Sequence, residues 1–130
     1  MVSNKKLEDG SFLYEWLPSD VELEESETPL TFELYSDWVE QVTDFDSPTY
    51  AVLGLGGESG EVVEAVKKLH RSYGDAWSTR AEYNELDTVA LEMGDVLWYI
   101  SRLASALGYS LSDIAEMNME KLNARRRRRV

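Results

Sequence analysis

The chain has 130 residues and a formal net charge of −12, with 25 acidic residues, 13 lysine or arginine residues and no cysteine. This length suits a single domain. The lack of cysteine excludes disulfides and thiol chemistry, and the acidic balance argues against binding nucleic acid through general electrostatics. No apolar run approaches the roughly 20 residues of a membrane-spanning helix, and the N-terminus lacks the apolar segment of a secretory signal. We therefore expect a cytoplasmic protein without membrane contact.

The charge pattern separates a central body from two ends. Residues 1–29 hold acidic runs and a few aromatic residues without a clean period, which indicates a loosely held acidic arm. We place one helical domain at residues 30–126 and a basic tail at residues 127–130. Arg125 to Arg129 supply five positive charges, so the rest of the chain carries a net charge of −17. We expect this run to be a frayed, solvated end; the alternatives are contacts with phosphates, a neighbouring subunit or nucleic acid.

Two helices are predicted in the first half of the domain. Residues 31–45 place apolar side chains at helical spacing, and Thr31 is a plausible N-cap. A second helix is predicted from Pro48 to Arg71, with Ser47 as its cap. Glycines interrupt its interior at a cost of about 1 kcal/mol each relative to alanine, which calls for close helix packing or room for a ligand. These glycines are Gly54, Gly56, Gly57 and Gly60.

A loop is predicted at residues 72–78, where Gly74 is the stop signal of the second helix. Thr79 and Glu82 have the spacing of a capping box, so a helical turn can start there. The third helix ends near Leu107.

Gly108 is the stop signal of that third helix, and a fourth begins near Ser110, which forms a capping-box pattern with Asp113. All four helices carry an apolar stripe that is most simply a core face. No segment is a convincing strand. The predicted fold is all-α, with four main helices.

Two pairs of acidic residues have the spacing of a metal site. Glu58 and Glu61 are three residues apart in the second predicted helix, and Glu92 and Asp95 have the same spacing in the third. Residues at i and i+3 share a helix face, so four carboxylates converge if the two helices lie side by side. Such a cluster repels itself unless a cation neutralises it, and an all-oxygen donor set suits Mg²⁺. The alternative is a solvated acidic face.

Basic residues that follow each acidic pair are candidates for binding a phosphorylated substrate. Lys68 lies beyond the first pair, and Lys121 and Arg125 lie in the fourth helix. A triphosphate needs cationic contacts as well as a metal, although cations near a helix C-terminus also complement its dipole. The lone histidine, His70, is interpreted as a surface residue rather than a zinc ligand. The glycine-rich segment lacks the pattern of a phosphate-binding loop.

Three segments of the chain, spread over about residues 31–126, resemble the MazG-like nucleotide pyrophosphohydrolases. They read GLGGESGEVVEAVKK, LEMGDVLWYISRLASALGYS and MNMEKLNARR. The acidic pattern of that family corresponds here to Glu58-x-x-Glu61 and Glu92-x-x-Asp95. Gly57 stands where many members carry a further glutamate.

The resemblance implies an all-α, four-helix bundle-like fold that works as a homodimer or a dimer of dimers. It implies hydrolysis of a nucleoside triphosphate to a monophosphate and pyrophosphate, with Mg²⁺ as the cofactor and Mn²⁺ as a substitute. Tyr99 resembles an aromatic residue that contacts the nucleotide in some members. Asn118 and Lys121 match a pair that resembles a phosphate-binding site, which Arg125 extends.

We therefore predict that Glu58, Glu61, Glu92 and Asp95 hold the metal and carry catalysis. Glu61 would help to deprotonate the attacking water, while Lys68, Asn118 and Lys121 would stabilise the developing charge. The competing hypothesis is a non-enzymatic acidic helical protein that mimics nucleic acid or binds basic proteins. Such a mimic needs acids spread over a surface, whereas an enzyme needs them focused at one point.

Overall fold

A computed structural model describes residues 5–6, 12–13 and 29–129, and the chain divides into two units, Met1–Thr31 and Phe32–Val130. In the first unit, β1 (Lys5–Lys6) and β2 (Phe12–Leu13) pair antiparallel, with Lys5 opposite Leu13. We expected no strand, and two-residue strands are too short to show an alternating pattern. Most of the predicted acidic arm lies outside the described residues.

The second unit begins with α1 (Phe32–Val42), which is shorter than the predicted range of 31–45. The hydroxyl of Thr43 donates to the Val39 carbonyl at 2.6 Å, just beyond the last turn. The chain leaves helical geometry after Val42, and the residue before Pro48, Ser47, is extended, as proline favours at that position. Residues 43–47 form the α1–α2 connection.

The helix α2 (Pro48–Tyr73) begins where the sequence predicted. The side chain of Ser47 accepts a hydrogen bond from the Tyr50 amide at 3.2 Å, and proline occupies the first turn. Gly74 ends the helix at a φ of 64°, which confirms the predicted stop signal.

The predicted loop at residues 72–78 is wrong in detail. A 3₁₀ turn at Gly74–Ala76 and a short helix, α3 (Trp77–Arg80), fill most of it. Thr79 donates to the Ala76 carbonyl at 3.1 Å and does not cap the next helix.

The helix α4 (Tyr83–Ala106) is capped by Glu82 and Glu85 rather than by the predicted Thr79–Glu82 pair. Glu85 accepts a hydrogen bond from the Glu82 amide at 2.9 Å and another from the Tyr73 hydroxyl at 2.8 Å. The second bond ties the end of α2 to the start of α4. A sequence pattern cannot anticipate it because it joins residues of two different helices.

The predicted turn and capping box before the last helix are confirmed. Gly108 has a φ of 83°, and Ser110 and Asp113 cap α5 (Leu111–Arg128) reciprocally. We expected this run to be a frayed, solvated end; α5 continues through it to Arg128, and its arginine side chains are exposed. Arginine is a good helix former, and cations at a C-terminus complement the helix dipole.

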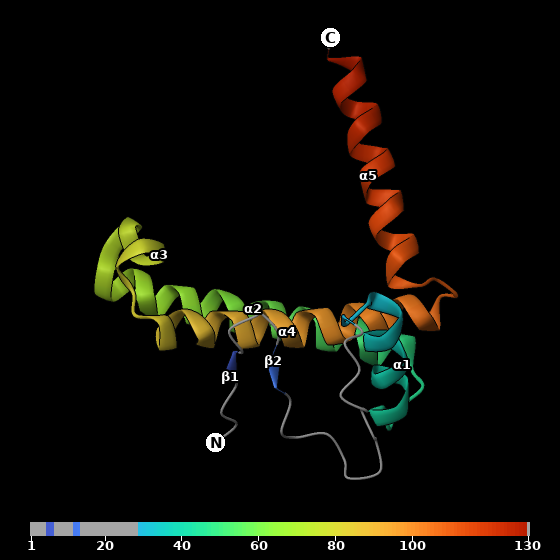
Figure 1. The fold of residues 1–130 in the computed structure, drawn as a ribbon, viewed down its shortest axis with the longest axis horizontal. Coiled ribbons are helices and arrows are strands. Elements are labelled where there is room, and N and C mark those ends of the chain that lie inside the picture. The colour runs from blue at the N-terminus through green and yellow to red at the C-terminus, as the bar shows by residue number, and fades with distance from the viewer. Residues whose placement is uncertain (1–4, 7–11, 14–28, 130) are drawn as a thin grey trace. The chain divides into compact units, whose positions relative to one another are not determined.

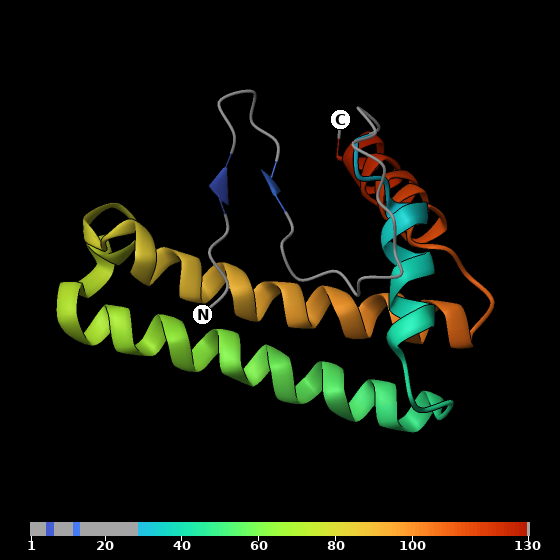
Figure 2. The same cartoon turned by 60° about the horizontal axis from the view of Figure 1, so that its bottom comes forward.

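The helical unit is all-α, and its most extensive pairing joins α2 and α4, which lie side by side (Figures 1 and 2). The helix α1 packs against α4, and α5 contacts α1 and α4 before its remaining length projects away from the pair (Figure 1). The buried apolar side chains come from all four main helices. They are Val39, Ala51, Leu69, Val89, Ala104 and Leu111.

Many apolar stripe residues that the sequence assigned to a core are exposed in the single chain. They include Leu34, Val42, Val52, Met93, Leu97, Leu107, Ile114, Met117 and Leu122. Placing them in a core was wrong for the isolated chain, because no other helix among residues 29–129 covers these faces. Among the helices of residues 29–129, none is long and apolar enough to cross a membrane.

Candidate metal centre

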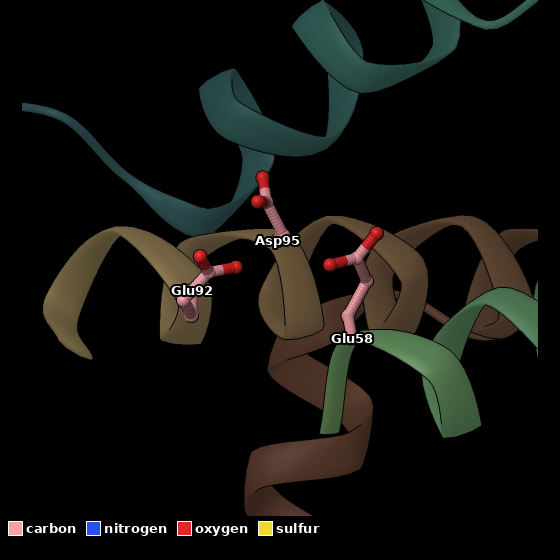
Figure 3. A group of neighbouring side chains, drawn as sticks. All are labelled: Glu58, Glu92 and Asp95. Carbon is pink, nitrogen blue, oxygen red and sulfur yellow. The ribbon is translucent and has the colours of Figure 1, made fainter. Parts of the chain in front are cut away.

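Three carboxylates from two helices meet on the α2–α4 pair. Glu58 belongs to α2, and Glu92 and Asp95 belong to α4; one oxygen of each lies within 4.8 Å of the others (Figure 3). Glu58 and Glu92 are partly buried, whereas Asp95 is exposed. The i, i+3 spacing gives the two α4 residues one face, and the helix pairing brings Glu58 to that face. The predicted convergence is therefore observed for these three residues.

The electrostatics of the cluster fit a cation. Burial raises the pKa of Glu58 above its ordinary value, and the charges of Asp95, Glu92 and Glu61 raise it further, in that order. Carboxylates that repel in this way are relieved by a bound cation. The donors are all oxygens, which is the set that Mg²⁺ prefers. The residues present therefore fit the metal that the sequence predicted.

Glu61 lies one turn after Glu58 and is exposed. Within the described residues, it is not in the group whose ligand atoms meet within 4.8 Å. It is close enough to raise the pKa of Glu58, although its influence is the smallest of those that do so. The structure thus brings three of the four predicted carboxylates together and leaves Glu61 at the edge.

Tyrosine side chains border the cluster. Tyr99 lies four residues after Asp95, and its pKa is raised by burial and then by Tyr50, Glu58, Asp95 and Asp44. Its ring packs so closely on α2 that a β-carbon at position 54 would overlap it. This close packing explains why a glycine, Gly54, stands inside the helix.

The other bordering tyrosine comes from α1. Burial raises the pKa of Tyr35 to about 12, with a smaller contribution from Asp95. The resemblance had named Tyr99 as a nucleotide contact, whereas the sequence placed Tyr35 in the apolar stripe of α1 and gave no sign that it lies near the cluster.

The other residues predicted to bind substrate are not beside the cluster in the single chain. Lys68 is exposed and lies ten residues beyond Glu58 in α2, about 15 Å along the helix axis. Asn118, Lys121 and Arg125 are exposed on α5, whose length projects away from the α2–α4 pair (Figure 1).

The family model of the MazG nucleotide pyrophosphohydrolase domain matches residues 46–130. The "Gene 37 protein" of Mycobacterium phage L5 is 38% identical to this chain over 82 residues, which is 63% of this chain and 68% of the phage protein. The family match contains α2, α4 and α5, and with them all three clustered carboxylates.

Proposed function

The chain belongs to the MazG nucleotide pyrophosphohydrolase family, and from that premise we propose that it hydrolyses a nucleoside triphosphate to a monophosphate and pyrophosphate. The observation that supports this most strongly is the meeting of Glu58, Glu92 and Asp95 at one point of the α2–α4 pair. A single focus of this kind favours a catalytic centre. The alternative, an acidic binding protein or nucleic-acid mimic, would need its acids spread over a surface.

Glu58, Glu92 and Asp95 would hold Mg²⁺, or Mn²⁺ in its place, and Glu61 would complete the set from the edge of the cluster. When bound, the metal offsets the charge of the phosphates and lowers the pKa of a coordinated water. Held by these carboxylates, the metal would supply positive charge for the nucleotide phosphates at the α2–α4 face. Tyr99 borders this position and would contact the nucleotide.

Glu61 is the proposed proton acceptor because it is exposed beside the cluster. The oxygen of a water attacks the α-phosphorus, and the bond from that phosphorus to the oxygen bridging to the β-phosphate breaks. The water's proton passes to Glu61, and the electron pair of the broken bond leaves on pyrophosphate. Cations near the leaving group would stabilise its charge. The proposed phosphate contacts are Lys68, Asn118, Lys121 and Arg125.

We propose a homo-oligomer, either a homodimer or a dimer of dimers. Large exposed apolar areas mark interfaces in soluble proteins, and the uncovered apolar faces of α1, α4 and α5 are of this kind. A second copy would also be a source of the α5 cations, which the single chain does not bring to its own cluster. Sedimentation at micromolar concentration should give a multiple of 14.8 kDa. The mass of one chain would contradict the proposal.

The proposed activity is tested by pyrophosphate release from a panel of nucleoside and deoxynucleoside triphosphates with Mg²⁺. Asp95→Asn should abolish turnover because the amide keeps the shape of the side chain but loses its charge. Asp87→Asn is the matched control, since Asp87 is an exposed acid of the same helix outside the cluster. No pyrophosphate from any nucleotide, or equal turnover in the two variants, would contradict the proposed site.

A further inference from the structure

Arg102 is a buried cation that the proposed reaction does not use. It lies in α4, seven residues after Asp95, and only 6% of its surface is exposed. One terminal nitrogen donates to the Glu40 carboxylate at 2.8 Å, and the other donates to the Asp46 carboxylate at 3.1 Å. The second nitrogen also reaches the Phe45 carbonyl at 3.5 Å. One side chain thus holds α1 and the α1–α2 connection to α4.

The energetics of this arrangement favour a positional role over a stabilising one. Burying a guanidinium costs several kcal/mol unless its partners repay it. Those partners are solvated, since the side chain of Glu40 is 47% exposed and that of Asp46 is fully exposed. The Nε of Arg102 finds no hydrogen-bond partner within the described part of the chain. The ion pairs therefore add little net stability, but they fix the geometry of three segments.

The contacts of Arg102 fix the position of the Phe45 ring. The Arg102 guanidinium lies 5.8 Å from the centre of that ring. The ring in turn lies 4.4 Å from the ring of Tyr50, 5.9 Å from that of Trp98 and 6.3 Å from that of Tyr99. Phe45 and Tyr99 are nearly parallel, at 22°. Held by Arg102, the Phe45 ring lies beside that of Tyr99.

Tyr99 links this aromatic group to the carboxylate cluster. It follows Asp95 by one helical turn and rests on the bare backbone of Gly54, four residues before Glu58. Tyr99 therefore belongs to one of the two helices that carry the cluster and contacts the other. A change in the position of Phe45 would free the ring of Tyr99 without separating α2 from α4.

We propose that Arg102 is a positioning residue, which holds Phe45 against Tyr99 and so fixes the aromatic wall beside the carboxylate cluster. This wall consists of the rings of Phe45, Tyr50, Trp98 and Tyr99. The proposal rests on the proposed function, in which a nucleotide bound at the cluster contacts this wall. Loss of Arg102 weakens nucleotide binding and leaves metal binding in place, because the cluster depends on the pairing of α2 and α4. The Arg102 ion pairs do not join those two helices.

The test compares Arg102→Met with Arg102→Lys and with the double variant Glu40→Gln/Asp46→Asn. Arg80→Met is the matched control, since Arg80 is an exposed arginine of α3. Steady-state kinetics give KM and kcat for each protein, and near-UV circular dichroism reports the packing of the aromatic rings. The double variant replaces both acids and leaves the buried arginine unchanged. The proposal can therefore be tested even if Arg102→Met does not fold.

We expect KM of Arg102→Met and of the double variant to rise about tenfold while kcat changes less than about threefold, as for a misplaced contact outside the reacting atoms. Arg102→Lys should recover part of the loss, because lysine keeps the charge without the two-armed geometry. The near-UV spectrum should change in step with KM. Arg80→Met should match the wild type in both measurements.

An Arg102→Met or double variant with the KM and near-UV spectrum of Arg80→Met would overturn the proposal. A fall of kcat as large as the rise of KM, in Arg102→Met and in the double variant alike, would also overturn it, since that result would assign Arg102 a role in the chemical step. If the wild type releases no pyrophosphate, the proposed function fails instead. The effect of Arg102 on the wall is then decided by the near-UV spectra alone.

Discussion

Two glycines of α2 give a matched test of the packing beside the cluster. Gly54 and Gly56 are two residues apart in one helix, and replacing either with alanine removes a helix-propensity cost of about 1 kcal/mol. A β-carbon at Gly56 would meet nothing within 4 Å in the described chain, whereas one at Gly54 would overlap the ring of Tyr99. Gly56→Ala should therefore stabilise the protein by about 1 kcal/mol.

Gly54→Ala carries the same propensity gain but must displace the Tyr99 ring, and overpacking of this kind costs about 1–3 kcal/mol. The difference between the two variants is the steric cost alone, because the helix contribution cancels. About 1 kcal/mol shifts the Tm of a domain this size by roughly 4 °C. Thermal unfolding followed by far-UV circular dichroism should place Gly54→Ala about 4–12 °C below Gly56→Ala. Equal melting temperatures would refute the contact between Tyr99 and Gly54.

Three further predictions concern metal, pH and phosphate contacts. Millimolar Mg²⁺ should raise Tm by mass action and EDTA should reverse the rise; an equal shift from monovalent salt at matched ionic strength contradicts this. The pKa of Glu58 is raised in the folded state, so the folded protein binds its proton more tightly than the unfolded chain does. In EDTA, the unfolding free energy of the wild type should therefore fall relative to that of Glu58→Gln as pH rises from the ordinary glutamate pKa to the raised one. A pH-independent difference contradicts this. Lys121→Ala should lower kcat/KM about a hundredfold or more, while deletion of residues 127–130 changes it only a few-fold, and the reverse order would misplace the phosphate contacts.

Features set by neighbouring residues in the sequence were predictable. Ser47 and Pro48 start α2, Gly74 ends it, and Ser110 with Asp113 caps α5, each through a bond or a backbone angle within a few residues. The i, i+3 spacing likewise placed Glu92 and Asp95 on one face. The family resemblance, carried by three separated segments, is confirmed by the match of the family model.

Features that join distant segments were not predictable. The capping box of α4 was assigned to Thr79 and Glu82, but Glu85 takes that role while it also binds Tyr73. The early end of α1 accompanies the contacts of Arg102 with the α1–α2 connection, 56 and 57 residues away in the sequence. The one available signal was that Arg102 is the lone basic residue of α4.

In the proposed reaction, water attacks the α-phosphate of a nucleotide bound at Glu58, Glu92 and Asp95. The most direct measurement is turnover of a nucleoside triphosphate in oxygen-18 water with Mg²⁺, followed by mass spectrometry of both products. We expect the label to enter the nucleoside monophosphate, pyrophosphate to stay unlabelled, and Glu92→Gln to form neither product. Label in pyrophosphate, release of inorganic phosphate as the first product, or undiminished turnover by Glu92→Gln would contradict it.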